Sequence, residues 1–171
     1  VIQKGPFLAG SHVRLYKLGM EGNRIGRRFD TETDARGNFS ADIGWSGPTE
    51  IEASGYFYDE LTALPSAVAQ QVSTLTIIEN DTSLNINLFA DFVAARTRHL
   101  LASGDTLRDA IDQASVDLQS LFHLQLTVSS SAGRLDLTDG ASAAAADNSN
   151  MLLFSAALLS SSIDANAFTV L

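Results

Sequence analysis

The sequence predicts an α+β protein, with an antiparallel β-sandwich over residues 1–87 followed by a helical hairpin and a further apolar helix over residues 88–171. Two observations support this prediction. Before residue 88, apolar residues alternate with polar ones in short runs separated by Gly, Pro and Asn, which is typical of strands joined by turns. After that point, apolar residues recur at every third or fourth position, which is typical of amphipathic helices.

The N-terminal half is expected to centre on a hairpin over residues 28–43. Residues 34–38, Asp-Ala-Arg-Gly-Asn, suit a tight turn, because Asp can bond its own backbone two residues on and Gly accepts a positive φ. Residues 28–33 are then predicted as one strand and residues 39–43 as the returning strand. Phe39, the first apolar residue after the turn, is expected to be buried as the anchor of that strand.

Further strands are predicted wherever the alternation is clear. Strands of this length, joined by short loops, form the pattern of a sandwich. Gly55 lies inside one of these runs, which indicates a bulge or a close backbone approach. The additional strands are expected at residues 1–3, 11–18, 49–58, 72–79 and 84–87.

Two helices are predicted next. The first spans residues 88–102, with Asn87 as its N-cap and Gly104 at its end. Thr106 and Asp109 resemble a capping box, with Asp in place of the usual Glu, and open a second helix. The short loop between the helices predicts an antiparallel hairpin. The apolar residues expected to face one another or the sandwich are Phe89, Phe92, Leu107, Ile111, Leu118 and Leu121.

The C-terminal third is less regular. Residues 124–128 and 133–137 are expected to pair as a short β-ribbon, and residues 140–150, rich in Ala, Ser and Asn, are interpreted as a loop or a weak helix. Residues 151–161 are apolar nearly all round, so this predicted helix should be buried between other elements or against a partner. Residues 163–171 are interpreted as a β-compatible tail.

The composition limits the classes of function. The chain of 171 residues carries 20 acidic and 11 Lys or Arg side chains, a net charge of −9, which argues against binding to nucleic-acid phosphates. The densest basic patch, Arg24, Arg27 and Arg28, either binds an anion or solvates the end of a hairpin. The chain contains no Cys, which excludes disulfides, thiolate catalysis and Cys-ligated zinc.

No targeting or membrane-spanning segment is predicted. The longest apolar run, residues 151–159, is too short to span a bilayer, and there is no signal peptide. Charged residues make up only 18% of the chain, as in many exported proteins with a polar but weakly charged surface. If the protein is exported, this chain is expected to be its processed form.

Several short runs of the sequence resemble a known family. They are VIQKGPFLAGS at residues 1–11, VRLY at 13–16, TDARGNF at 33–39, IEASGYF at 51–57, NINLF at 85–89 followed by Arg96 and Arg98, and NMLLFSA at 150–156. Together these runs are similar to bacterial surface lipoproteins that begin with a carboxypeptidase-regulatory-like, transthyretin-like β-sandwich and continue into a helical segment. The resemblance implies an extracellular location or the outer cell surface of a bacterium, with membrane attachment only through a lipid anchor absent from this chain. It brings no catalytic motif.

Candidate metal ligands are few and scattered. His12, His99 and His123 are expected on a strand, a helix and a helix end, so the sequence predicts no convergence on a zinc ion. Oxygen-rich loop positions would suit a structural calcium ion, although turns and helix caps explain them better. These positions are Asn80, Asp81, Asp139, Asp147 and Asn148. No cofactor is predicted beyond this calcium alternative.

Glu50 and Glu52 are the most suggestive pair of carboxylates. They lie two apart on a predicted strand, so both should face the same side. With Asp42 or Glu32 from a neighbouring strand they would imitate the carboxylate pair of a glycosidase, but an acidic solvent face explains the same residues. The sequence also contains no Gly-x-Ser-x-Gly motif. The protein is therefore predicted not to be an enzyme.

Aromatic residues are expected to gather at one end of the sandwich. They are Trp45, Tyr56 and Tyr58, with Phe57 between the tyrosines. If exposed, they form a platform for stacking a sugar or binding a protein, and if buried, they belong to the core. The platform supports the alternative functional interpretation, a surface binding module that recognises polysaccharide or a protein partner.

The preferred functional interpretation is a non-enzymatic structural protein that acts outside the cell by self-association. Both ends of the chain are apolar and β-compatible, and apart from Asp164 residues 163–171 carry no charged side chain that would prevent pairing with a sheet edge. A strand added to the next subunit makes a head-to-tail contact that does not close, so it would build a filament. Alternatively, the tail pairs within its own sheet. The candidate contact residues are Val1, Ile2, Phe168, Val170 and Leu171.

Overall fold

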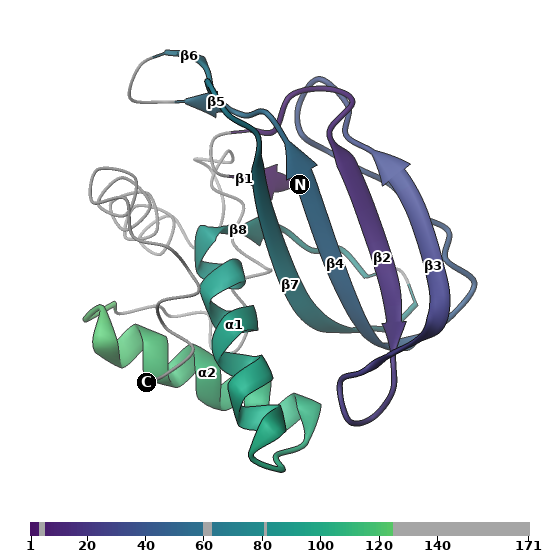
Figure 1. The fold of residues 1–171 in the computed structure, drawn as a ribbon, viewed down its shortest axis with the longest axis vertical. Coiled ribbons are helices and arrows are strands. Elements are labelled where there is room, and N and C mark those ends of the chain that lie inside the picture. Colours follow the sequence, from purple (N-terminus) through teal and green to yellow (C-terminus); the bar gives the residue numbers. More distant parts are fainter. Residues whose placement is uncertain (4–5, 60–62, 81, 125–171) are drawn as a thin grey trace.

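The computed structural model describes residues 1–3, 6–59, 63–80 and 82–124, arranged as Figure 1 shows. A four-stranded antiparallel sheet forms the centre, with two helices on one side and two short strands on the other, which confirms the predicted α+β class. In chain order the elements are β1 (Ile2–Gln3), β2 (His12–Leu18), β3 (Arg24–Glu32), β4 (Gly47–Gly55), β5 (Tyr58–Asp59), β6 (Leu64–Pro65), β7 (Gln70–Ile78), β8 (Ile86–Asn87), α1 (Leu88–Ala102) and α2 (Leu107–Leu121).

The main sheet has the strand order β3-β2-β4-β7, and every neighbouring pair is antiparallel. Leu15 of β2 lies opposite Phe29 of β3 on one side and Ile51 of β4 on the other, and Ile51 lies opposite Thr74 of β7. Because side chains alternate along a strand, this register sends these residues to the same face of the sheet. Their neighbours along each strand, including Glu50, point to the opposite face.

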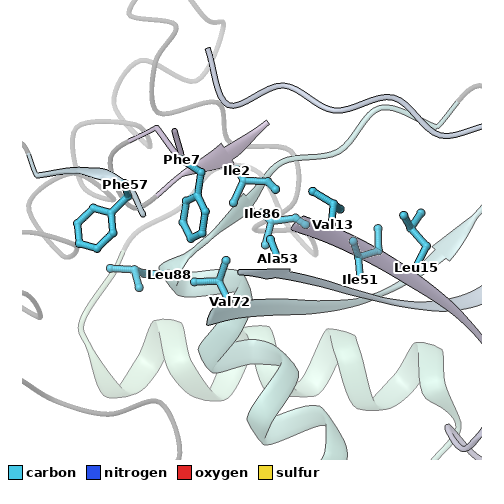
Figure 2. Close-up of a cluster of buried hydrophobic side chains, with 10 residues drawn as sticks. All are labelled: Ile2, Phe7, Val13, Leu15, Ile51, Ala53, Phe57, Val72, Ile86 and Leu88. Carbon is cyan, nitrogen blue, oxygen red and sulfur yellow. The ribbon is translucent and has the colours of Figure 1, made fainter. Parts of the chain in front are cut away.

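The face that bears Leu15 and Ile51 packs against β1 and β8. These two strands pair in parallel, with Ile2 opposite Ile86, and both of these side chains are fully buried. Figure 2 shows the resulting cluster between β1 and the main sheet, with the helices on the other side of the sheet. We call this cluster the strand-side core; its buried members are Ile2, Phe7, Val13, Leu15, Ile51, Ala53, Phe57, Val72, Ile86 and Leu88.

The opposite face of the sheet packs against α1, which lies over β7, and α2 in turn packs against α1. Leu75 of β7 points to this face and is buried with Leu18, Ala94 and Leu107. Ile111 of α2 is partly buried against the same cluster, which we call the helix-side core. The sheet is therefore covered on both faces, by strands and loops on one side and by helices on the other.

Both predicted helices are confirmed, together with their N-caps. The Asn87 side chain accepts a hydrogen bond from the Ala90 N–H at 2.9 Å, and α1 begins directly after it. The Thr106 hydroxyl accepts from the Asp109 N–H, which caps the helix, and donates to the Asp109 carboxylate at 2.7 Å, so Asp109 holds the capping hydroxyl and does not bind the Thr106 backbone N–H of a capping box. Leu121, predicted to face inward, is 43% exposed at the last residue of α2, whereas Phe122 directly after it contacts Phe92 of α1.

The predicted hairpin is only partly correct. Residues 34–38 do turn back, with Gly37 at a φ of 75°, but β3 pairs with β2 and residues 39–43 join no strand ladder among the described residues. The reason is that the turn carries the chain to the layer of β1, where the Gly37 carbonyl accepts a hydrogen bond from the Ile2 N–H at 2.9 Å. Phe39 is consequently half-buried against the strand-side core rather than fully buried.

The layer opposite the main sheet is thinner than the predicted sandwich requires. Among the described residues it consists of the short β1–β8 pair and of the extended segment 38–46. The predicted boundary after residue 87 falls where β8 runs directly into α1. Apart from Leu124, the predicted ribbon, apolar helix and tail of the C-terminal third lie outside the described residues.

Candidate functional site

A groove of about 1240 Å³ lies on the strand side of the main sheet. Residues 38–46 line one side of it, and residues 78–80 and 82–85, which connect β7 to β8, line the other. Leu15 and Ile51 of the main sheet form its floor. The groove is therefore bounded by two segments that belong to no strand ladder, above a β-sheet.

The first wall of the groove, residues 39–46, has the side-chain pattern of a strand. Half-buried and exposed residues alternate along it without a break. Its half-buried side chains, Phe39, Ala41, Ile43 and Trp45, all pack against the strand-side core. This segment therefore lies over the sheet with its apolar side inward, as a sandwich strand does.

The backbone of the same segment is unpaired. Residues 39–44 make no hydrogen bond to any other residue in the described part of the chain. Backbone N–H and C=O groups require partners, and a row of them without partners is an edge that can accept a strand. We call residues 39–46 the open edge.

Both ends of the open edge are fixed. At its start, hydrogen bonds from Asn38 and from the Arg36 N–H hold the pKa of the Asp34 carboxyl below its ordinary value. Gly37 is required in this turn, because its φ is positive and a Cβ would lie only 3.1 Å from the Ile2 carbonyl oxygen. At the other end, the Trp45 indole N–H donates to the Thr49 hydroxyl at 3.1 Å.

The charged side chains of the groove are acidic. They are Asp42 and Glu79, and no Lys or Arg among the described residues lines it; the Val1 amine is the one positive group there. Such a surface disfavours an anionic ligand. The groove therefore suits a neutral or basic segment with apolar side chains better than a phosphate-bearing one.

A cluster of ion pairs lies on the opposite face of the sheet, around Glu50. Its carboxylate accepts hydrogen bonds from Arg24 Nε at 2.6 Å and from Arg98 of α1, and Arg24 also binds Glu52. Glu50 is only 6% exposed. Burial raises the pKa of Glu50, but the hydrogen bonds from the two arginines outweigh it, so the pKa lies below its ordinary value. The Glu50 carboxylate in turn raises the pKa of Arg24.

This cluster joins α1 to the sheet. The Ser73 N–H and hydroxyl of β7 donate to the Asp91 carboxylate of α1, at 2.7 and 3.0 Å. Arg98 reaches from the same helix to β4. The Arg24 guanidinium also lies 3.6 Å above the ring of Tyr16, a cation–π contact. The cluster therefore fixes the position of the helix on the sheet.

The glycosidase-like arrangement of Glu50 and Glu52 is not formed. The two carboxylates share a face of the sheet, as predicted, and both are bound to arginine. Glu32 instead lies 3.7 Å from His12 at the exposed end of β3, and Asp42 lines the groove on the other face. The acidic solvent face that was the competing interpretation is also wrong for Glu50, because arginines cover it.

The predicted basic patch is largely neutralised. Arg24 binds two carboxylates of β4, and Arg28 pairs with Asp30 at 2.7 Å. Arg27 is exposed on β3. The three arginines therefore do not converge on a site for an anion.

The aromatic residues of the predicted platform are separated. Trp45 precedes β4 and lines the groove, whereas Tyr56 and Tyr58 follow β4 and are 51% and 40% exposed. β4 has nine residues. At about 3.3 Å per residue, its two ends lie roughly 30 Å apart. The single platform is wrong, because residues that flank the same strand lie at opposite ends of the sheet.

The candidate metal ligands considered from the sequence are spread over the structure. Within the described ranges, no group of three or more His, Cys, Asp or Glu side chains could hold a metal ion. His12 begins β2, His99 lies in the last turn of α1, and His123 follows α2. Asn80 lines the groove. The other predicted calcium positions, Asp81, Asp139, Asp147 and Asn148, lie outside the described residues.

The residues predicted to mediate self-association differ in their surroundings. Ile2 is fully buried within its own chain, so it offers no free surface. Val1 is half-buried and lines the groove, where its N-terminal amine donates to the Leu84 carbonyl at 3.2 Å. Phe168, Val170 and Leu171 lie outside the described residues.

No family model, curated protein or solved structure matches the chain. In the described part of the protein, no helix is both long and apolar enough to cross a membrane. The groove and its open edge are the features from which a function can be argued.

Proposed function

We propose that this protein is a non-enzymatic structural protein that acts by association, and that its groove takes up an extended apolar segment as an added strand. The observation that supports this proposal is the open edge, residues 39–46. It combines the alternating burial of a strand with a backbone that makes no hydrogen bond over residues 39–44 within the described part of the chain.

Strand addition would satisfy both features of the open edge. An incoming extended segment supplies N–H and C=O groups in the spacing that an unpaired edge requires. Its alternate side chains would cover the half-buried apolar residues of both walls, which include Phe39 and Ile43 on one side and Ile78 and Leu84 on the other. Apolar area removed from water stabilises the complex by about 25 cal/mol per Å² before the costs of association.

The proposed partner is a second copy of the chain. A contact between a groove and a different part of the next subunit does not close, so repeated contacts would build a filament. The resemblance to bacterial surface lipoproteins favours an extracellular or outer-surface location, with any lipid anchor outside this chain.

The absence of catalysis is part of the proposal. The strongest constellation of titratable groups, around Glu50, is occupied by ion pairs that join the helix to the sheet. The groove contributes the carboxylates Asp42 and Glu79, with no described histidine beside them. A binding surface requires no proton transfer, so it is compatible with paired carboxylates. An acid–base role would need an unpaired titratable group within reach of a substrate. We propose no cofactor.

The alternative proposal is a surface binding module for polysaccharide or a protein partner. It is favoured by the exposed rings of Tyr56 and Tyr58 and by the exposed side chains of Leu64 and Val68 near the same end of the sheet. Without Trp45 this surface is smaller than the platform predicted from the sequence. It remains the second candidate.

Hydrogen exchange measured at low and high protein concentration tests the proposal. If the open edge accepts a strand on association, the amides of residues 39–44 should exchange at least about tenfold more slowly at high concentration. The exposed strand β3 provides the internal control, because it is an edge strand of the main sheet, away from the layer that contains residues 39–44.

Three outcomes are informative. Protection confined to residues 39–44 supports the groove. Protection confined to β3 means that the protein associates through the edge of its main sheet, which refutes the groove as the site. A protein that remains monomeric by light scattering at high concentration, with no change in exchange, refutes self-association altogether.

A further inference from the structure

We propose that the segment that fills the groove is the C-terminal tail, residues 165–171, of a second copy of the chain. This inference rests on the proposed function and names the strand that the groove receives. The charge of the groove, the side-chain pattern of the tail and the face of the sheet on which the groove lies all favour this segment.

The charge of the groove selects among the segments of the chain. Asp42 and Glu79 line it, so an acidic strand would be repelled. Residues 165–171, Ala-Asn-Ala-Phe-Thr-Val-Leu, carry no charged side chain. Residues 133–137, another predicted strand after the helices, carry Asp136 as well as Arg134, and their insertion would bring the Asp136 carboxylate close to those of the groove.

The side chains of the tail alternate as the groove requires. Phe168 and Val170 fall on one side of an extended strand, and Thr169 falls on the other. The bulky side would cover the apolar residues that are half-buried along the open edge, such as Ile43. Aromatic and β-branched residues favour strands, and Phe168, Thr169 and Val170 are all of these types.

The position of the groove argues against the segment directly after α2. Residues 124–128 also alternate, but Leu124 follows a helix that packs on the opposite face of the sheet. Five extended residues span at most about 18 Å, and crossing a sheet edge from one covered face to the other requires two layer spacings of about 10 Å each. The tail of a neighbouring copy reaches the groove from outside and needs no such crossing.

The contact is heterologous, because the groove of one copy meets the tail of another. It leaves one free groove and one free tail at every stage of assembly, which permits chain growth. The same geometry predicts that a defect in the groove and a defect in the tail, placed on different molecules, should complement each other.

Two matched substitutions in the full-length chain test the role of the tail. Val170→Asp places a charge on the side that faces the apolar residues, and Thr169→Asp places the same charge on the other side. Val170→Asp is expected to weaken association by more than about tenfold, and Thr169→Asp by much less, as measured by sedimentation velocity. If Val170→Asp associates like the unmodified chain, the tail is not the inserted strand.

A mixing experiment tests the source of the strand. The Val170→Asp chain retains its groove, and an Ile43→Arg chain retains its tail. Each alone should be monomeric, and an equimolar mixture should give dimers that grow no further. The alternative is that the tail occupies the groove of its own chain. In that case the unmodified chain should be monomeric, and a synthetic peptide of residues 165–171 should bind only when the chain's own tail is disrupted. This result would exclude the second copy as the source of the strand.

The same peptide tests the tail independently of the proposed function. The experiment needs no substitution in the groove, so it does not depend on a groove variant that folds. Hydrogen exchange of the Val170→Asp chain with added peptide should show protection at residues 39–44. If the peptide gives no protection while the unmodified chain still gains it on association, the groove receives another strand: the proposed function survives and the tail is wrong. If the peptide binds and protects β3 instead, the groove is wrong.

Discussion

Replacing Glu50 by Gln should destabilise the protein by about 2 kcal/mol at neutral pH. The Glu50 side chain is only 8% exposed, and it holds Arg24 and Arg98, which are 43% and 44% exposed. Removing one partner from a fully buried ion pair costs about 3–5 kcal/mol, whereas exposed pairs contribute about 0–1 kcal/mol. Because the acid is buried and both arginines keep nearly half their exposure to water, the expected cost lies between these limits.

The pH dependence identifies the charge as the cause. Since the pKa of Glu50 is lowered in the folded protein, its ionisation stabilises the fold above its unfolded pKa, about 4.3, and this stabilisation is lost as the pH falls through the folded value. Urea unfolding of the unmodified and Glu50→Gln proteins should therefore differ at pH 7 and converge in acid, where Glu50 becomes protonated in the folded protein. Asp30→Asn, which removes the exposed ion pairs with Arg28 and Arg14, is the matched control and should cost less than about 1 kcal/mol.

Two results would refute this reasoning. A Glu50→Gln protein as stable as the unmodified protein at pH 7 would mean that desolvation of Glu50 cancels its ion pairs. A difference that persists unchanged into acid would mean that the substitution acts through packing, because the protonated carboxyl and the amide are then equivalent in charge.

Three further substitutions test the fold. Phe39→Ala should cost about 2 kcal/mol in urea unfolding, below the value for a fully buried Phe, because Phe39 is half-buried; a loss below about 0.5 kcal/mol would show that the open edge is not packed on the core. Gly37→Ala should destabilise the protein by about 1 kcal/mol more than Gly44→Ala in thermal melts. Both glycines have a positive φ, but only at Gly37 would a Cβ meet backbone atoms. Equal costs would exclude the close contact with β1. Ile111→Glu should open the helix pair and cost about 2 kcal/mol, which lowers the melting temperature by several degrees. Val116→Glu, on the exposed side of α2, should leave the melting temperature unchanged. An Ile111→Glu protein with an unchanged melting temperature would place α2 away from the sheet.

Local signals in the sequence were sufficient for most of the elements. The N-caps of both helices could be predicted because the capping side chain and the N–H that it accepts lie three residues apart, as Asn87 and Ala90 do. The turn at residues 34–38 could be predicted because Asp34 bonds the backbone within the same turn. Each of these contacts is decided by neighbours in the chain.

Contacts between distant residues could not be predicted in the same way. Arg24 lies 26 residues before Glu50, and Arg98 lies 48 residues after it. No spacing rule links such positions, because their meeting depends on the order of strands in the sheet and on where α1 crosses it. The shared face of Glu50 and Glu52 followed from alternation along one strand, but the arginines that bind them followed from the tertiary fold.

The open edge lies between these two cases. Its side-chain alternation is local, and it supported the prediction of a strand at residues 39–43. Its hydrogen bonding is not local, because a strand also needs a neighbouring backbone, and the Gly37 contact with Ile2 places this segment in the layer opposite the main sheet. The prediction was therefore right about which side chains of this segment face inward and wrong about its pairing partner.

Association and folding should be coupled at the open edge. Phe39 and Ile43 pack on the strand-side core from one side of the groove, and Ile78 and Leu84 do so from the other, all with part of their apolar surface still exposed. A strand that enters the groove would bury this surface and pair the backbone of residues 39–44 in one step, so whatever binds there also stabilises the fold by mass action. Phe39→Ala should therefore weaken association as well as stability, and raising the concentration of the unmodified protein should raise its melting temperature. A melting temperature that stays constant while the protein associates would show that the interface lies away from this layer.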